Sequence, residues 1–165
     1  MARDDGWKIF AGRKVGLLTN PTGVLPSTLE HAVDVMRASG GGVDLRAIFS
    51  PEHGFRGAAQ AGVSAVAVAA SSPSQMTSQH PDFDAAAAAA AGGVAAAVAS
   101  APFPDPRTAL PVYDTYLKSG AALTAILSSS GVDTIAFDIQ DVGARFYTYV
   151  WTLYDVMVGR LDRDI

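Results

Sequence analysis

Residues 15–23 are Val15-Gly16-Leu17-Leu18-Thr19-Asn20-Pro21-Thr22-Gly23, a short apolar run closed by turn-forming residues. A run of this length that ends in such a turn is typical of a buried β-strand. Two more apolar runs, residues 45–50 and 134–139, follow the same pattern, and each leads into a polar loop that contains glycine. The sequence therefore predicts three strands with a polar loop after each.

Helical patterns separate these strands. Ser27-Thr28-Leu29-Glu30 fits a capping box, which predicts a helix that begins here and stops at residues 40–42, a run of three glycines. Further helices are expected at residues 121–129 and near the end of the chain. In the last helix, one stripe is interpreted as facing the core: Tyr147, Val150, Trp151, Tyr154, Val158 and Leu161. For Tyr147, Tyr149 and Trp151, the alternative is a surface that stacks on a sugar.

The alternation of strands and helices predicts an α/β fold, a Rossmann-like parallel sheet with flanking helices and right-handed crossovers. The predicted domain spans residues 8–165, and an insertion rich in alanine, serine and proline interrupts it at about residues 64–107. Three strands make a small sheet with exposed edges, which is unusual for a finished domain. We therefore expect an incomplete N-terminal domain of a longer polypeptide.

The composition argues against several classes of function. The 165 residues carry a net charge of −4, whereas nucleic-acid binding needs a basic face. The absence of cysteine excludes disulfides, thiolate catalysis and cysteine-based zinc sites. No apolar run is long enough to span a membrane, no signal peptide is visible, and no G-x-G-x-x-G motif follows the first strand. We therefore expect no nucleic-acid partner, no membrane span and no dinucleotide cofactor.

The three polar loops are the expected site of chemistry. In an open α/β sheet, ligands bind beyond the carboxyl ends of the strands, and parallel strands bring these ends to one rim. The polar side chains of the loops are therefore predicted to converge on one pocket. They are Thr19, Asn20 and Thr22 in the first loop, Glu52, His53 and Arg56 in the second, and Asp138, Gln140, Asp141 and Arg145 in the third.

Glu52 is the strongest candidate for a catalytic group. It lies between a proline and a histidine in a glycine-bounded loop that follows a strand. Such a loop can shield a carboxyl group from water, which disfavours the charged form and suits a general acid. The alternative is a solvated loop glutamate. His53 is predicted to orient Glu52, to shuttle a proton or to bind a metal, and the alternative is a histidine bonded to the backbone.

The remaining charged side chains have two interpretations each. Asp138 and Asp141 flank a strand end, so at least one of them should point into the cleft. Alternatively, Asp141 caps the turn and Asp138 pairs with Arg145. Arg145 and Arg56 each offer a bidentate fork for a substrate carboxylate, or else they form structural salt bridges.

Four segments carry a recognisable pattern: residues 12–23, 49–57, 110–113 and 137–149. The most specific parts are the Pro-Glu-His-Gly block and the Asp-Ile-Gln-Asp-Val-Gly-Ala-Arg-Phe-Tyr-Thr-Tyr block. Together these segments resemble the exo-β-N-acetylmuramidase family, long known as a domain of unknown function (DUF1343). The resemblance implies a Rossmann-like catalytic domain joined to a smaller C-terminal domain, which is absent from this chain, with the active site between the two.

This resemblance implies release of N-acetylmuramic acid from the non-reducing end of peptidoglycan fragments, so a peptidoglycan-derived saccharide is the expected partner. It also implies a periplasmic or extracellular location. By motif position, Glu52 is the implied catalytic carboxyl group. The residues implied to line the pocket are His53, Asn20, Gln140, Asp141, Arg145 and Tyr147.

The resulting hypothesis requires no cofactor and no metal. Its catalytic residues are Glu52, His53 and Asp141, and its substrate-binding residues are Asn20, Arg56, Asp138, Gln140, Arg145 and Tyr147. Glu52 protonates the leaving oxygen, while an aspartate or the acetamido group of the substrate supplies the second function. Two alternatives stay open. One is a metal-dependent hydrolase that uses Glu52, His53 and the aspartates, and the other is a non-catalytic module that binds a cell-wall sugar.

Overall fold

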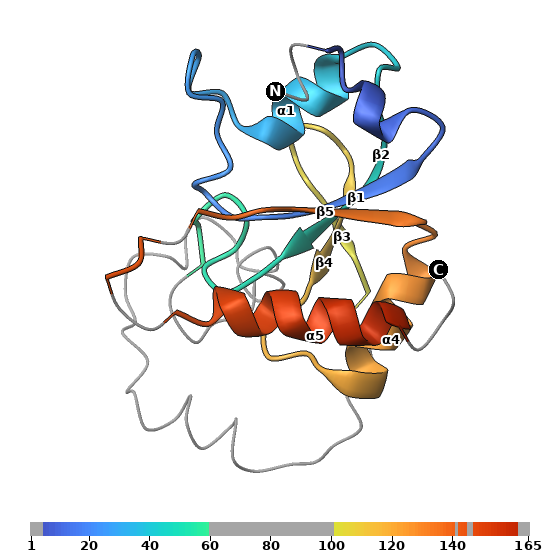
Figure 1. Ribbon diagram of the computed structural model, residues 1–165, viewed down its shortest axis with the longest axis vertical. Coiled ribbons are helices and arrows are strands. Elements are labelled where there is room, and N and C mark those ends of the chain that lie inside the picture. The colour runs from blue at the N-terminus through green and yellow to red at the C-terminus, as the bar shows by residue number, and fades with distance from the viewer. Residues whose placement is uncertain (1–4, 60–100, 141, 145–146, 162–165) are drawn as a thin grey trace.

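The computed structural model describes residues 5–59, 101–140, 142–144 and 147–161. In this part of the chain a five-stranded sheet runs through the middle of the molecule, and its strands lie in the order β3-β4-β2-β1-β5 (Figure 1). The bounds of the strands are Lys14–Thr19 for β1, Asp44–Ser50 for β2, Phe103–Pro104 for β3, Pro111–Asp114 for β4 and Thr134–Asp138 for β5.

The three strands predicted from the sequence are confirmed as β1, β2 and β5. β1 pairs in parallel with β2 on one side and with β5 on the other. The sequence did not predict β4, which pairs in parallel with β2, or β3, which runs antiparallel to β4. The fold is the predicted α/β class with a mostly parallel sheet, and the edge strand β3 runs antiparallel to β4. Residues 105–110 join β3 directly to β4, and consecutive strands with so short a connection pair antiparallel.

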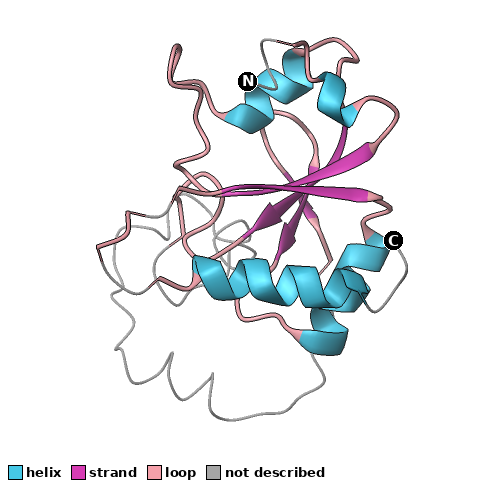
Figure 2. Ribbon diagram, in the orientation of Figure 1, coloured by secondary structure: helices cyan, strands magenta, loops and turns pink. Residues whose placement is uncertain are grey.

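Helices cover both faces of the sheet (Figure 2). The 3-10 helix η1 and helix α1 lie on one face, and helices α4 and α5 lie side by side on the other. Their bounds are Lys8–Phe10 for η1, Ala32–Ala38 for α1, Gly120–Ser129 for α4 and Tyr149–Leu161 for α5. In this part of the chain, no helix is long and apolar enough to cross a membrane.

Alternate residues of the strands fill two separate cores. Leu17 and Ile48 pack under α1, whereas their chain neighbours Leu18 and Phe49 pack under α4 and α5. All four side chains are at most 2% exposed, and burial of a side chain of this size stabilises the fold by about 1.5–3 kcal/mol. The period of two along a strand therefore supports both layers of helices at once.

The strand order places a crevice between β1 and β5. After β1 the chain builds the sheet outward through β2 and β4, and then returns through α4 to place β5 on the other side of β1. In sheets of this kind, the loops on either side of such a reversal leave a crevice beyond the strand ends. The first and third polar loops follow β1 and β5, the two strands at this reversal.

The predicted start of the first helix is wrong. Helix α1 begins at Ala32, and its N-cap is His31, whose Nδ1 accepts a hydrogen bond of 3.3 Å from the backbone N–H of Val33. Leu29 lies in a left-handed turn with φ of 56° and is 74% exposed. The capping box fails because Nε2 of the same histidine contacts the backbone oxygen of Asn20 at 3.1 Å. This tertiary contact fixes the helix start at a later residue.

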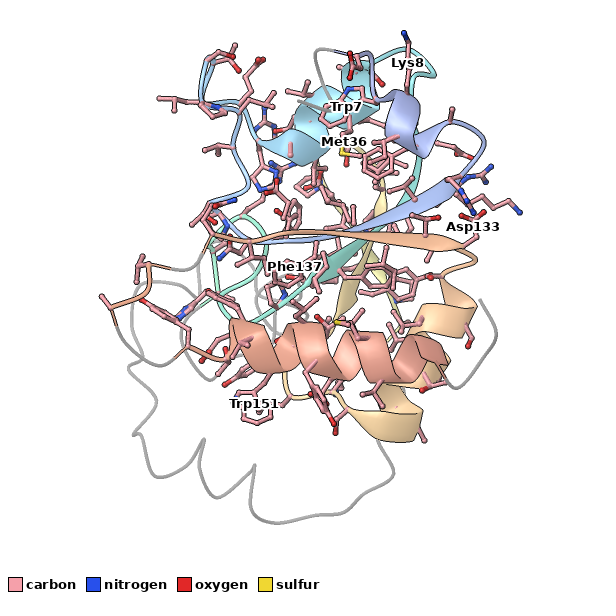
Figure 3. All side chains as sticks on the ribbon, viewed as in Figure 1. Trp7, Lys8, Met36, Asp133, Phe137 and Trp151 are labelled. Atoms are coloured by element: carbon pink, nitrogen blue, oxygen red, sulfur yellow. The ribbon has the colours of Figure 1, made fainter. Side chains whose placement is uncertain are left out.

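The predicted core stripe of the last helix is also wrong. Trp151 is 65% exposed and lies on the side of α5 that points away from the sheet (Figure 3). Val150, Tyr154 and Val158 are exposed as well, and the side chain of Leu161 lies outside the described residues. The buried positions are instead Tyr149, Val156 and Gly159. This face of α5 packs against α4, where Gly159 lies next to Thr124 and Leu127.

The predicted insertion is shorter at its C-terminal end than expected. Residues 101–107 were assigned to it, but they contain β3 and the fully buried Asp105. Residues 64–100 of the expected insertion lie outside the described residues.

Candidate active site

The first loop is built around Asn20, which is 2% exposed. Its Oδ1 accepts hydrogen bonds from the backbone N–H and the hydroxyl of Thr22, at 3.0 and 2.6 Å. Two further bonds tie this loop to the third one. The Thr19 hydroxyl donates to the backbone oxygen of Asp138 at 2.9 Å, and the Thr22 hydroxyl accepts from the backbone N–H of Gln140 at 2.9 Å. The predicted convergence of the first and third loops is thus observed.

The third loop is described only in part. The side-chain amide of Gln140 donates to Oδ1 of Asp138 at 3.4 Å, and Gln140 itself is exposed. Asp141 and Arg145, for which catalytic and binding roles were predicted, lie outside the described residues. Their roles therefore stay predictions.

The second loop is a tight turn that follows β2. The buried Ser50 accepts a bond from the backbone N–H of Phe55 at 3.0 Å, and the N–H of Gly54 donates to the oxygen of Pro51 at 3.0 Å. His53 has a φ of 67°, a left-handed conformation that costs a non-glycine residue on the order of 1–3 kcal/mol. Its Nδ1 lies 3.4 Å from the backbone oxygen of Ala59. The backbone on both sides of Glu52 is therefore tightly constrained.

The carboxyl group of Glu52 is held by two hydroxyl groups from other parts of the chain. The Tyr116 hydroxyl donates to Oε1 at 3.2 Å, and the Thr148 hydroxyl donates to Oε2 at 2.7 Å. Tyr116 follows β4, and Thr148 directly precedes α5. Burial, the charge of Glu52 and the hydrogen bond to it raise the pKa of Tyr116, so this hydroxyl keeps its proton. Glu52 is half-buried, in contrast to the solvated loop glutamate that was the alternative.

Tyr116 and Thr148 were not predicted as site residues. The signal for Tyr116 was its position just after the apolar run 110–113, the same strand-then-polar pattern that marked the other three loops. The signal for Thr148 was its place inside the Phe-Tyr-Thr-Tyr block. Tyr116 was overlooked because the fourth strand was not predicted, and Thr148 because only the aromatic residues of its block were considered.

Arg56 takes part in a structural ion-pair network. Its guanidinium donates to Asp105 at 2.9 and 2.8 Å and to Asp34 at 3.1 and 2.8 Å. The bonds from Arg56 lower the pKa of Asp34. Burial acts to raise the pKa of Asp105, but the bonds from Arg56 and Thr108 outweigh it and lower the pKa. This arrangement corresponds to the salt-bridge interpretation, so we do not assign Arg56 to the substrate.

A pocket of about 250 Å³ lies where the three loops meet. Tyr147 and Tyr149 form a stacked pair in its wall, with ring centroids 5.6 Å apart and planes at 5°. Glu52 does not line this pocket, but its partner Thr148 is the residue between the two tyrosines. The full lining is Asn20, Pro21, Thr22, His53, Gln140, Val142, Tyr147 and Tyr149.

The arrangement combines an aromatic wall, polar loop groups and a constrained carboxyl group close to one rim. Aromatic faces with a few placed polar groups suit the binding of a small polar ligand, and an oriented carboxyl group suits proton transfer to it. Within the described residues, no group of three or more histidine, aspartate or glutamate side chains is placed to hold a metal ion.

Comparison with known proteins agrees with this architecture. The chain is 34% identical over 158 residues to the peptidoglycan beta-N-acetylmuramidase NamZ of Bacillus subtilis, a match that covers 96% of this chain and 29% of that protein. It also resembles the crystal structures of two DUF1343 family proteins from Bacteroides fragilis. The match to the first has a TM-score of 0.62 at 26% identity and covers 99% of this chain and 30% of the first protein. The match to the second has a TM-score of 0.54 at 23% identity and covers 98% of this chain and 30% of the second protein.

The chain thus spans less than a third of the length of these relatives. The profile of one family, described as the N-terminal part of exo-beta-N-acetylmuramidase NamZ, matches residues 15–79 and 86–164. This match includes all three polar loops and the strands that position them. The chain therefore belongs to the NamZ exo-beta-N-acetylmuramidase family, of which it represents the N-terminal part.

Proposed function

We propose that this chain is the catalytic part of a glycoside hydrolase that releases N-acetylmuramic acid from the non-reducing end of peptidoglycan fragments. The relative from Bacillus subtilis is named as a peptidoglycan beta-N-acetylmuramidase, and family membership supports the same class of reaction here. The observation that carries the proposal is the carboxyl group of Glu52, which two hydroxyl groups hold next to a pocket with an aromatic wall.

In this proposal Glu52 acts as the general acid. Its proton passes to the glycosidic oxygen while the bond from that oxygen to the sugar carbon breaks, so the bonding electrons stay with the leaving group. Tyr147 and Tyr149 supply a flat wall for the sugar ring. Asp138 or Asp141, or the acetamido group of the sugar, supplies the second function, and Arg145 is proposed for the lactyl carboxylate.

The other predicted residues support the site through the backbone. Asn20 uses its Oδ1 to shape the first loop, and the left-handed conformation of His53 shapes the second. Gln140 is the exposed polar group of the pocket whose amide is best placed to meet a ligand. We therefore propose Gln140 for substrate contact and assign Asn20 mainly to loop structure.

The test is Glu52→Gln in the full-length protein that contains this chain, with release of the terminal sugar from a peptidoglycan fragment as the assay. Loss of a general acid typically lowers the rate by about 10²–10⁴-fold. The matched control is Glu30→Gln, which changes an exposed glutamate on another loop and should leave the rate unchanged. A Glu52→Gln protein that keeps more than a tenth of the wild-type rate removes Glu52 from the acid role.

A second candidate function is binding of a cell-wall saccharide without turnover. It is favoured by one observation, that Glu52 does not line the pocket. In that case the Glu52→Gln protein and the wild type bind the fragment equally well by calorimetry, and neither releases the terminal sugar.

A further inference from the structure

We propose that Tyr116 and Thr148 are positioning residues, which fix the carboxyl group of Glu52 and stabilise the charge left on it after proton transfer. This inference rests on the proposed role of Glu52. No property of the loop sequence 51–57 identifies these two residues, because they lie in other segments, Tyr116 after β4 and Thr148 directly before α5.

The two hydroxyl partners reach Glu52 from different parts of the chain, one after β4 and the other directly before α5. Tyr116 binds Oε1 and Thr148 binds Oε2, at 3.2 and 2.7 Å. A carboxyl group that is held at both oxygens cannot rotate freely about its last side-chain bond. Reactive groups must be held close to their productive geometry, so a constraint of this kind favours the reaction.

The segment that carries Tyr116 is itself held in place by hydrogen bonds. Its backbone N–H donates to Oδ1 of Asp114 at 3.0 Å. The preceding Thr115 uses its N–H and its hydroxyl to bind the backbone oxygen of Ser50, at 2.9 and 3.0 Å. The end of β4 is therefore tied to the end of β2, directly before the loop that carries Glu52. Burial and the nearby charge of Glu52 raise the pKa of Tyr116, so the hydroxyl remains a donor at neutral and mildly alkaline pH.

Thr148 is held at the N-terminal end of helix α5. The backbone oxygen of Thr148 accepts the N–H of Thr152 at 3.0 Å, so Thr148 stands at the start of the helix. Its hydroxyl donates outward to Glu52. The N-terminal end of a helix carries a partial positive charge that favours a nearby carboxylate. The hydrogen bond from Thr148 and the partial charge of the helix end therefore both stabilise negative charge on Glu52.

Proton transfer from Glu52 changes the charge of the carboxyl group that the two hydroxyl groups contact. When Glu52 gives its proton to the glycosidic oxygen, a negative charge remains on the carboxyl group. Hydrogen bonds to a charged group are stronger than those to a neutral one, so both hydroxyl bonds strengthen as the proton leaves. The hydroxyl groups thus lower the energy of the transition state more than that of the ground state.

The experiment uses Tyr116→Phe and Thr148→Val in the full-length protein. Each change removes one hydroxyl group, and loss of a hydrogen bond to a charged group predicts a fall in kcat/KM of about 10- to 100-fold. Thr148→Ser keeps the hydroxyl and should restore most of the rate.

Two controls separate a positioning role from a folding role. Tyr154→Phe removes a hydroxyl from an exposed residue of helix α5 and should leave kcat/KM unchanged. Thermal unfolding of every variant should stay cooperative, at a midpoint within a few degrees of the wild type.

The outcomes distinguish this inference from the proposed function. If Glu52→Gln abolishes turnover but Tyr116→Phe and Thr148→Val keep at least half of the wild-type kcat/KM, the positioning role is wrong and the acid role stands. If Glu52→Gln itself remains active, the proposed function fails first. A low rate for Thr148→Ser as well as Thr148→Val would also overturn the role of the hydroxyl.

Discussion

Replacement of Arg56 by methionine decides whether this side chain is structural or belongs to the substrate site. Methionine has a similar length and fills much of the same space, so the substitution removes the charge and the hydrogen bonds while leaving only a small cavity. The side chain of Asp105 is 0% exposed, and that of Asp34 is 19% exposed. The substitution therefore leaves one fully buried carboxylate without its cation.

The expected loss of stability can be estimated from these contacts. Breaking a buried ion pair by removing one partner costs about 3–5 kcal/mol. Asp105 keeps two bonds from Thr108, at 3.0 and 2.6 Å, and Asp34 keeps partial access to water and its contact with Arg107. These remaining interactions place the estimate at the lower end, about 3 kcal/mol, which is a large part of the stability of an ordinary domain.

The effect should depend on pH in a defined direction. The pKa values of Asp34 and Asp105 lie below 3.8 in the folded chain, so their pairing with Arg56 contributes stability above that pH and loses it as the pH falls through the folded values. The stability difference between wild type and Arg56→Met should therefore be full at pH 7 and smaller at pH 3. Equilibrium unfolding in urea, followed by fluorescence at both pH values, measures it.

The control for this measurement is Arg46→Met. Arg46 forms an ion pair of 2.6 Å with Asp44, but the two side chains are 55% and 48% exposed, so loss of this pair should cost less than about 1 kcal/mol. A cost below 1 kcal/mol for Arg56→Met at pH 7, together with weaker saccharide binding, would refute the structural role and return Arg56 to the substrate site.

Two further predictions concern close packing and the exposed helix face. Gly23→Ala should destabilise the chain by about 1–3 kcal/mol, because a Cβ at this position collides with the hydroxyl of Thr19, whereas Gly42→Ala meets only ordinary contacts and should be nearly neutral in the same urea assay. Trp151→Ala should change the free energy of unfolding of this chain by less than about 0.5 kcal/mol, whereas Val156→Ala, which opens the core, should cost about 1–3 kcal/mol. Equal costs for the members of either pair would contradict the assigned packing.

The sequence predicted the strands that carry complete apolar runs, and it missed those that do not. β1, β2 and β5 each combine such a run with a turn, and this pattern is sufficient for a central strand of a parallel sheet. β4 has only four residues and begins with a proline, so its pairing depends on the neighbouring β2. The missed strand is the reason that Tyr116 was missed as well.

The helices show where local patterns lose to tertiary contacts. The capping box near Glu30 is a valid local signal, but the bond between His31 and the backbone of Asn20 determines where α1 begins. In α5, helical spacing predicts an apolar stripe, but apolar residues occur on more than one face. The face that is buried is the one that packs against α4 and the sheet, and this packing is a tertiary contact that helical spacing does not encode.

The location of the candidate site could be predicted from topology, whereas its contacts could not. Parallel strands bring their carboxyl ends to one rim, and the bond between Thr22 and Gln140 confirms that the first and third loops meet there. The hydroxyl groups that reach Glu52 and the aspartates that pair with Arg56 come from residues 22 to 96 positions away. Such partners leave no periodic trace in a single sequence.

The most direct test of the acid role is a crystal structure of the full-length Glu52→Gln protein with an uncleaved disaccharide that ends in N-acetylmuramic acid. The account predicts that the sugar ring lies against Tyr147 and Tyr149, and that the side-chain amide of residue 52 lies within about 3 Å of the glycosidic oxygen. A disaccharide seated in the pocket with that oxygen well beyond hydrogen-bond reach of residue 52, and nearer to another carboxyl group, would contradict it.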